Sequence, residues 1–150
     1  MPDAALPQIE FSADDFALRF EAEIPATVEA IEPIVGKIMA VVEEFGCADG
    51  HEFEVDLALR EALSNAILHG CDSDPEQVVC VNVGCARPKG ILITVQDPGE
   101  GFDPTSIPSP VIGQNIFSSH GRGIFLINQL MDEVKFERGG TEIHMVKRGE

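Results

Sequence analysis

Hydrophobic and polar residues alternate along the first half of the chain in two different rhythms. Apolar side chains recur at every second position in residues 16–23, which predicts a half-buried strand. They recur at every third and fourth position in residues 33–45, before Gly46, and again in residues 52–69, before Gly70. This second rhythm predicts two amphipathic helices, each ended by a glycine.

The second half of the chain predicts two pairs of strands, separated by a long loop and a helix. The turn residues 87–89 and 138–140 lie between apolar runs of strand length, as in antiparallel hairpins. Between the two pairs, proline, glycine and polar residues are too frequent for a periodic element, and long loops in compact domains usually have a function. The expected elements are strands at 77–86 and 90–97, a loop at 98–120, a helix at 123–131, and strands at 133–137 and 141–147.

The order of these elements, β-α-α-β-β-loop-α-β-β, indicates an α+β fold. We expect a two-layer sandwich, with the helices on one face of a mixed, mainly antiparallel sheet. The chain has 150 residues, of which 44% are hydrophobic, and this is enough for one core without room for a second. We therefore expect a single domain over residues 1–150, within which residues 1–14 form a flexible N-terminal arm.

Charge and hydropathy narrow the classes of partner and the location. The formal net charge of −16 repels nucleic acid and anionic lipid, so we expect neither nucleic acid nor a membrane as a direct partner. A basic surface on a protein partner is favoured instead. No apolar run approaches the ~20 residues of a membrane-spanning helix, and the N-terminus lacks the basic and apolar segments of a secretory signal. We therefore expect a cytoplasmic protein.

Four cysteines raise the question of a metal site: Cys47, Cys71, Cys80 and Cys85. None of them forms a CxxC pair, and no close Cys/His cluster completes a zinc-ligand set. In a strand over residues 78–86, Cys80 and Cys85 are an odd number of positions apart and point to opposite faces, which argues against a shared ion. The sequence therefore predicts buried free thiols.

Polar side chains follow one stripe of the second predicted helix near its C-terminal end. Glu61, Asn65 and His69 are four residues apart, so they share a face of an otherwise apolar helix. A carboxylate and a carboxamide one turn apart provide a proton acceptor and an oxygen ligand suited to Mg2+. A solvated helix face explains the same pattern, because polar stripes on helices are common. The choice between these interpretations depends on other segments.

An acidic residue and two glycines follow along the chain. Asp97 falls on the apolar face of the strand at 90–97, where a carboxylate is costly unless it is paired or hydrogen-bonded. The exocyclic amine of an amino-purine is a fitting donor. Gly99 and Gly101 allow the backbone to approach a ligand closely. A turn at the end of a hairpin explains the same D-x-G-x-G pattern, so the segment alone does not identify a purine site.

Glycines also precede the last predicted helix. Gly121 and Gly123 stand directly before it in the segment HGRGIFLINQL, where N–H groups and the positive end of the helix dipole attract phosphate. Arg122 between them is placed to reach a γ-phosphate or a partner, and a solvated arginine fits its position equally well. Because an acidic protein repels ATP, a nucleotide site here requires a cation, and Mg2+ is the expected one.

In this order and at this spacing, the three segments resemble the GHKL superfamily of gyrase, histidine kinase and MutL ATPases, which has the Bergerat ATP-binding fold. Residues 61–70 are similar to its N box, residues 97–101 to its first glycine box and residues 120–127 to its second. Gly140 and Thr141 are similar to the short box that follows. Together with the leading strand and helices, the resemblance covers nearly the whole chain.

The resemblance implies roles for residues in each segment. It implies that Glu61 is a general base, that Asn65 ligates Mg2+, and that Asp97 accepts a hydrogen bond from the adenine amine, with support from Thr141. The residues that it places at the ATP and Mg2+ site are Asn65, His69, Asp97, Gly99, Gly101, Gly121, Arg122, Gly123, Ile124 and Thr141. Two features depart from the family pattern. Ile124 stands where a leucine is usual. The lid at residues 104–119 is proline-rich and uncharged, and this difference affects which partner is bound and how tightly the γ-phosphate is enclosed.

Within the superfamily, the short layout, the EALSNAILHG form of the N box and the C-terminal segment look like anti-sigma-factor serine kinases of bacterial partner-switching systems. This resemblance implies a Mg-ATP-dependent protein serine/threonine kinase that regulates an antagonist of the anti-anti-sigma type and sequesters a sigma factor. A homodimer is one expected assembly.

Two other functions are compatible with the same segments. One is an ATP-dependent sequestering module without kinase activity, and the other is a detached catalytic domain of a histidine kinase. Glu61 favours the kinase over the first, because a purely structural ATP site has no need of a base. Against the second, the sequence predicts no preceding helical hairpin with a phosphoacceptor histidine.

Overall fold

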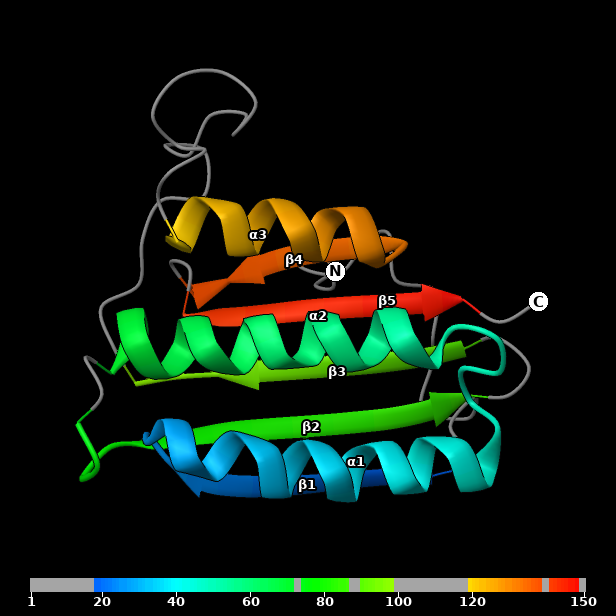
Figure 1. Cartoon of the computed structure of the whole chain (residues 1–150), viewed down its shortest axis with the longest axis horizontal. Coiled ribbons are helices and arrows are strands. Elements are labelled where there is room, and N and C mark those ends of the chain that lie inside the picture. The colour runs from blue at the N-terminus through cyan, green and yellow to red at the C-terminus, as the bar shows by residue number, and fades with distance from the viewer. Residues whose placement is uncertain (1–17, 72–73, 87–89, 99–118, 139–140, 149–150) are drawn as a thin grey trace.

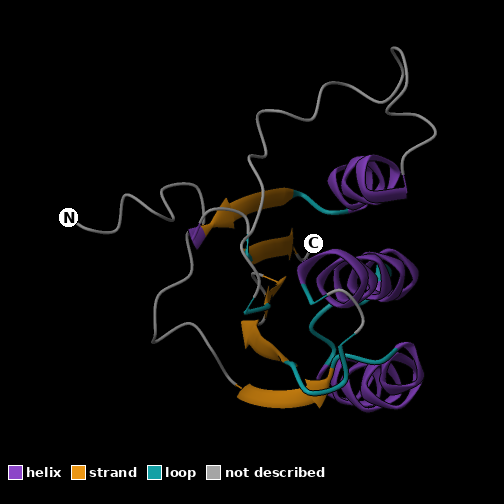
Figure 2. Cartoon of the chain, turned by 90° about the vertical axis from the view of Figure 1, so that its left-hand side faces the viewer, coloured by secondary structure: helices purple, strands orange, loops and turns teal. Residues whose placement is uncertain are grey.

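The chain folds into a helical layer and a sheet layer in the computed structural model (Figures 1 and 2). The structure describes residues 18–71, 74–86, 90–98, 119–138 and 141–148. Within these ranges, five strands form one sheet, and three α-helices pack on one of its faces. None of the described helices is both long enough and apolar enough to cross a membrane.

The elements follow the predicted order. The strands are β1 (Leu18–Pro25), β2 (Val78–Ala86), β3 (Gly90–Gln96), β4 (Glu133–Glu137) and β5 (Glu142–Arg148). The α-helices are α1 (Ile31–Phe45), α2 (Glu52–Asn65) and α3 (Ser119–Leu130). A 3-10 turn at Val28–Ala30 precedes α1, and a π-helical turn at Ala66–Gly70 follows α2.

The strand order in the sheet is β1-β2-β3-β5-β4, and each neighbouring pair is antiparallel. The strands at residues 78–86 and 90–96 pair as a hairpin, and so do those at residues 133–137 and 142–148. The second hairpin joins the first through β5 and β3. The predicted α+β two-layer sandwich is therefore confirmed.

Alternation along the central strands explains why the helices cover only one face. The odd-numbered residues of β2 and β3 are buried in the core, and they are Val79, Val81, Val83, Cys85, Ile91, Ile93 and Val95. Apolar residues of the helices complete this core, among them Ile38, Leu59 and Leu63. Full burial of such a side chain contributes about 1.5–3 kcal/mol. Asn82 and Thr94, which pair across β2 and β3, belong to the opposite face.

Two helix boundaries differ from the prediction. α3 begins at Ser119, before the predicted start at Gly123, because glycines near a helix start do not prevent helical geometry, although they weaken the sequence signal. α2 ends at Asn65, and the expected continuation to residue 69 is a π-helical turn. In this turn the N–H of Cys71 donates to the C=O of Ala66 at 2.9 Å. One turn is too short for hydrophobic rhythm to distinguish a π-helix from an α-helix.

The prediction that all four cysteines are free thiols is wrong for two of them. Cys47 and Cys85 form a disulfide with their Cα atoms 5.5 Å apart, whereas Cys71 and Cys80 are thiols outside any disulfide. The partners are 38 residues apart in the sequence and meet only when the α1–α2 connection packs on β2, so local spacing could not reveal them. The predicted opposite facing of Cys80 and Cys85 agrees with the structure, since Cys85 lies in the core and Cys80 contacts Glu23 of β1 at 3.9 Å.

Candidate functional site

Four element ends lie together at one end of the molecule: the C-terminal ends of α2 and β3, and the N-terminal ends of α3 and β5 (Figure 1). Each of them carries residues that the sequence predicts for a nucleotide site. They are Glu61 and Asn65 on α2, Asp97 directly after β3, Gly123 on α3, and Thr141 directly before β5. The fold therefore gathers segments that are far apart in the sequence.

The C-terminal half of α2 packs closely against the start of α3 at Gly123. A Cβ atom on Gly123 would lie 2.9 Å from Oε1 of Glu61, and 3.2 Å from both Oδ1 and Nδ2 of Asn65. Cβ atoms essentially never come within 3.0 Å of such an atom, so a larger residue would displace the carboxylate. The missing side chain at Gly123 thus provides the space in which the polar ends of Glu61 and Asn65 lie.

Arg60 links α2 to α1 by an ion pair on the protein surface. Its Nε donates to Oδ1 of Asp56 at 2.6 Å, and its Nη1 donates to Oε2 of Glu32 on α1. The Arg60 guanidinium holds the pKa of the exposed Glu32 carboxyl below its usual range. The sequence did not predict the ion pair between Arg60 and Glu32. Its only local signal is that an arginine precedes Glu61 in the second predicted helix. Neighbouring residues of α2 therefore contact different helices, because Arg60 contacts α1 and Glu61 lies next to α3.

The first turn of α3 supplies backbone donors beside these α2 side chains. The first four N–H groups of an α-helix have no acceptor within the helix, and the helix dipole makes this end positive. In the described part of α3 they include the N–H groups of residues 119–121, among them Gly121. An anion such as phosphate is favoured at such an end. The predicted position of Gly121 and Gly123 before the helix is corrected: both lie within its first turns.

Asp97 and Thr141 lie side by side where β3 ends and β5 begins. The N–H of Asp97 donates to the C=O of Thr141 at 2.9 Å, one position beyond the last β3–β5 pair, Gln96 with Glu142. Oγ1 of Thr141 donates to the C=O of Arg138 at 2.9 Å, which holds the threonine side chain. Arg138 has a φ of 55°, in the left-handed region, and sequence reasoning recognised only a turn at this position. The pairing brings two predicted adenine contacts next to each other.

Several predicted site residues lie outside the described residues. They are Gly99, Gly101, Gly140 and the lid residues 104–118, together with the side chains of His69 and Arg122. Ile124 is described and half-buried, and its C=O accepts a hydrogen bond from Nδ2 of Asn128 at 2.9 Å. The ligand contacts expected for all these residues stay predictions.

The oxygen atoms at the α2–α3 contact suit a hard cation that is bound together with phosphate. Mg2+ takes few protein oxygens and completes its octahedral shell with phosphate oxygens and water. Oε1 of Glu61 and Oδ1 of Asn65 both face the space at Gly123, next to the start of α3. Among the described residues, no group of three or more His, Cys, Asp and Glu side chains could hold a metal ion. Asn65 therefore fits as one protein ligand of a Mg2+ ion whose other ligands are phosphate oxygens and water, and the Glu61 carboxylate lies beside it.

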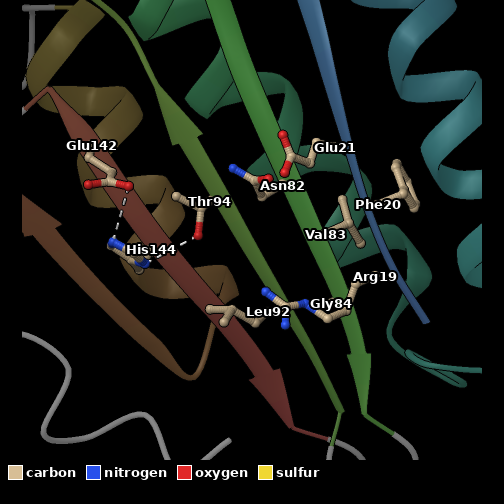
Figure 3. Close-up of a pocket in the computed structure, with 10 residues that line it drawn as sticks. All are labelled: Arg19, Phe20, Glu21, Asn82, Val83, Gly84, Leu92, Thr94, Glu142 and His144. Atoms are coloured by element: carbon tan, nitrogen blue, oxygen red, sulfur yellow. Dashed lines mark hydrogen bonds and ion pairs between the residues drawn. The ribbon is translucent and has the colours of Figure 1, made fainter. Parts of the chain in front are cut away.

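A separate hollow of about 440 Å3 lies on the sheet face opposite the helices, and none of the described candidate residues lines it (Figure 3). In its lining, Oγ1 of Thr94 and Nδ1 of His144 form a hydrogen bond of 3.2 Å. Nε2 of His144 lies 3.7 Å from Oε2 of Glu142. Burial lowers the pKa of His144, an effect that Glu142 and Glu137 oppose and Lys135 strengthens.

The folded protein is expected to lose stability through His144 as the pH falls below about 6.5. A lowered folded-state pKa means that the unfolded chain binds the proton more readily, so the penalty is absent above the unfolded pKa and grows below it. His144→Gln keeps a hydrogen-bonding group but removes the titrating ring, and we expect it to reduce the loss. Urea unfolding of both proteins at about pH 7.5 and about pH 5.5 measures this. Equal losses in the two proteins would contradict the prediction.

Comparisons with known proteins agree with the geometry. The model of the histidine kinase-like ATPase domain matches residues 24–147, a range that includes every candidate residue named above. The anti-sigma F factor of Bacillus cytotoxicus is 30% identical over 99 residues, which cover 63% of this chain and 67% of that protein. The serine-protein kinase RsbW of Staphylococcus epidermidis is 28% identical over 137 residues, covering 85% and 84%. The RsbW of Bacillus subtilis strain 168 is 26% identical over 136 residues, covering 85% and 83%.

Proposed function

Because this chain belongs to the histidine kinase-like ATPase domain family, we propose that it is a protein serine/threonine kinase that uses Mg-ATP to phosphorylate a partner protein. Relatives named serine-protein kinase RsbW extend over most of the chain, which supports this activity. The observation that carries the proposal is the contact between Glu61 and the start of α3 at Gly123. It sets a carboxylate beside a helix end that favours phosphate.

In this proposal Glu61 is the general base. Its carboxylate accepts the proton of a serine or threonine hydroxyl while that oxygen bonds to the γ-phosphorus and the bond to ADP breaks. The N–H groups at the start of α3 bind phosphate oxygens and stabilise the charge that spreads over them. Asn65 would hold Mg2+, which neutralises phosphate charge when bound. Each role fits the atoms that lie at the α2–α3 contact.

The part of the proposed site at the end of β3 and the start of β5 binds the base of the nucleotide. Asp97 accepts a hydrogen bond from the adenine amine, and Thr141 supports this contact. The backbone hydrogen bond of 2.9 Å between these residues supports the pairing of their roles, because it holds the two strand ends together. Asp97 follows the buried Val95 by two residues, so its side chain continues the buried face of β3. A purine bound to Asp97 would lie beyond the end of that face.

The proposed partners are proteins. We propose an antagonist protein with a serine or threonine acceptor as the substrate, and a sigma factor as a sequestered partner. The name serine-protein kinase of one relative supports a protein substrate with a serine acceptor, and the name anti-sigma F factor of another supports the sigma factor. The formal net charge of −16 supports partners with basic contact surfaces and weighs against direct binding of nucleic acid. A homodimer remains part of the proposal as the assembly to be tested.

A transfer experiment tests this function directly. The protein is incubated with Mg2+, γ-labelled ATP and the products of neighbouring genes, and the labelled residue is identified by mass spectrometry. Label on serine or threonine of a partner supports the proposal. ATP and partner binding without any transfer would replace it with a sequestering module, and label on histidine would replace it with a histidine kinase domain. Unchanged ATP affinity in excess chelator would exclude the role of Mg2+.

Asp97→Asn is expected to weaken ATP binding by roughly 10-fold, because an amide oxygen accepts a hydrogen bond less strongly than a carboxylate. Discrimination against GTP should fall as well, since this residue is proposed to recognise the adenine amine. Calorimetry with ATP and GTP measures both effects. Asp49→Asn, an equal charge change at an exposed position, is the control and should bind as the parent does. Parental ATP affinity in Asp97→Asn would exclude the proposed base contact.

A further inference from the structure

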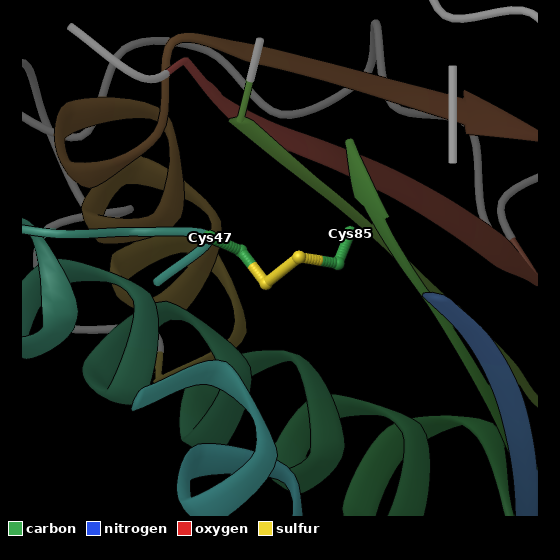
Figure 4. The surroundings of a disulfide bond; sticks show 2 residues. All are labelled: Cys47 and Cys85. Carbon is green, nitrogen blue, oxygen red and sulfur yellow. A yellow bond between two sulfur atoms is a disulfide. The ribbon is translucent and has the colours of Figure 1, made fainter. Parts of the chain in front are cut away.

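A covalent link joins the two layers at the end of the molecule opposite the candidate site. Cys47 lies in the connection between α1 and α2, and Cys85 lies near the end of β2 (Figures 1 and 4). Their side chains are 3% and 0% exposed, and both belong to the hydrophobic core. The disulfide therefore attaches the segment that leads into α2 directly to the sheet.

The end of α1 places Cys47 for this link. Gly46 has a φ of 67°, its N–H donates to the C=O of Glu43, and the N–H of Cys47 donates to the C=O of Val42, both at 3.3 Å. This is the Schellman arrangement, in which a left-handed glycine turns the chain back over the last helical turn. The backbone thus holds Cys47 against the core by hydrogen bonds that do not depend on the oxidation state of its sulfur.

The two remaining cysteines are in different environments. Cys71 is a buried thiol outside the disulfide, and Cys80 has its Sγ atom 3.9 Å from Oε2 of Glu23. Burial, together with the carboxylates of Glu23 and Glu21, raises the pKa of the Cys80 thiol. Because the thiolate is the reactive form, this environment suppresses thiol–disulfide exchange by Cys80.

We propose that Cys47 and Cys85 form a reversible redox site that switches the domain between a cross-linked and a reduced state of different stability. Both states fit the core, because a free cysteine behaves as a small hydrophobic side chain. The cross-link spans 38 residues of sequence, and links of this kind lower the unfolded population by roughly 30- to 1,000-fold. The inference depends on the fold and is independent of the proposed kinase activity.

The proposed chemistry is exchange with a low-molecular-weight disulfide such as glutathione disulfide. The two protein thiols give up two electrons and two protons, the S–S bond of the oxidant breaks, and two glutathione thiols form as the protein disulfide is made. Since both sulfur atoms are buried, glutathione disulfide in the oxidising direction and an external thiolate in the reducing direction reach them only after the α1–α2 connection opens. Opening of this connection is therefore expected to control the rate of switching.

The test compares the same protein after treatment with glutathione disulfide and after reduction with a phosphine. Thiol titration in denaturant should find two free thiols in the first sample and four in the second. Peptide mapping should find Cys47 linked to Cys85. The oxidised protein should melt roughly 5–15 °C higher than the reduced protein. Four free thiols after oxidation, a different pairing or equal melting temperatures would each overturn the proposal.

Two variants separate this pair from the other cysteines. In a Cys71→Ala, Cys80→Ala double variant, the difference in melting temperature between oxidised and reduced protein should persist. In Cys47→Ala the difference should vanish, while circular dichroism shows that the fold is retained. The reverse pattern would assign redox sensitivity to Cys71 or Cys80. Reduction of the native protein as fast as in denaturant would contradict control by opening of the α1–α2 connection.

Discussion

Replacement of Glu61 by Gln is expected to lower phosphoryl transfer to the partner protein by about 100-fold or more, since general-base catalysis typically contributes this much. The amide has nearly the size of the carboxylate and keeps one oxygen, but it does not accept the hydroxyl proton. ATP affinity should change little. Single-turnover transfer from labelled ATP, together with calorimetry, measures the two quantities separately.

A matched control comes from the same helix. Glu54 is an α2 glutamate near the opposite end, 3.8 Å from His51, so Glu54→Gln makes the same chemical change away from α3. This variant should transfer phosphate at the parental rate. If Glu61→Gln also does so, the base is assigned to the wrong residue. If the ATP affinity of Glu61→Gln falls by the same factor as its transfer rate, Glu61 contributes to ATP binding and is not the general base.

The two layers were predictable from the spacing of apolar residues, because this spacing follows directly from which side chains are buried. A strand buried on one face must place an apolar residue at every second position, as β3 does with Ile91, Ile93 and Val95. A helix on that face must present a stripe, as α1 does with Ile34, Ile38 and other residues. The order of strands and helices then restricts the architecture, and the two-layer α+β sandwich follows.

Features that depend on contacts between distant segments were not predictable in this way. The Cys47–Cys85 disulfide depends on how the α1–α2 connection packs on β2, which no local pattern encodes. The start of α3 at Ser119 lies in a segment whose glycines reduce the helix signal. The π-helical turn after Asn65 differs from an α-helical turn only in backbone hydrogen bonding.

The candidate site was predicted as three separate segments, and resemblance to GHKL ATPases linked them. The family match confirms that resemblance over residues 24–147. The structure adds how two of the segments meet, because Gly123 lies against Glu61 and Asn65. From sequence, Gly123 was expected to serve phosphate binding through its backbone. Its position shows a second use, since the missing side chain leaves room for the α2 residues.

Gly123→Ala is therefore expected to reduce phosphoryl transfer by roughly 10- to 100-fold while the domain stays folded. The new Cβ would lie 2.9 Å from Oε1 of Glu61, and the flexible end of that side chain is the part that can move away. Displacement of a catalytic group by about 1 Å can lower a rate by ~100-fold. Single-turnover transfer and thermal melting of the variant measure activity and stability separately.

Gly36→Ala provides the control for the effect of alanine on a helix. Gly36 lies within α1, and a Cβ atom there would have nothing within 4 Å, so this variant should gain up to about 1 kcal/mol of stability at unchanged activity. Gly123 also lies inside a helix, and the same gain in helix propensity offsets part of the strain that its substitution introduces. A stable Gly123→Ala protein with slow transfer would show that space beside Glu61 matters for the chemistry. Parental transfer rates in that protein would show that the Glu61 carboxylate tolerates displacement and that its contact with α3 does not position it for catalysis.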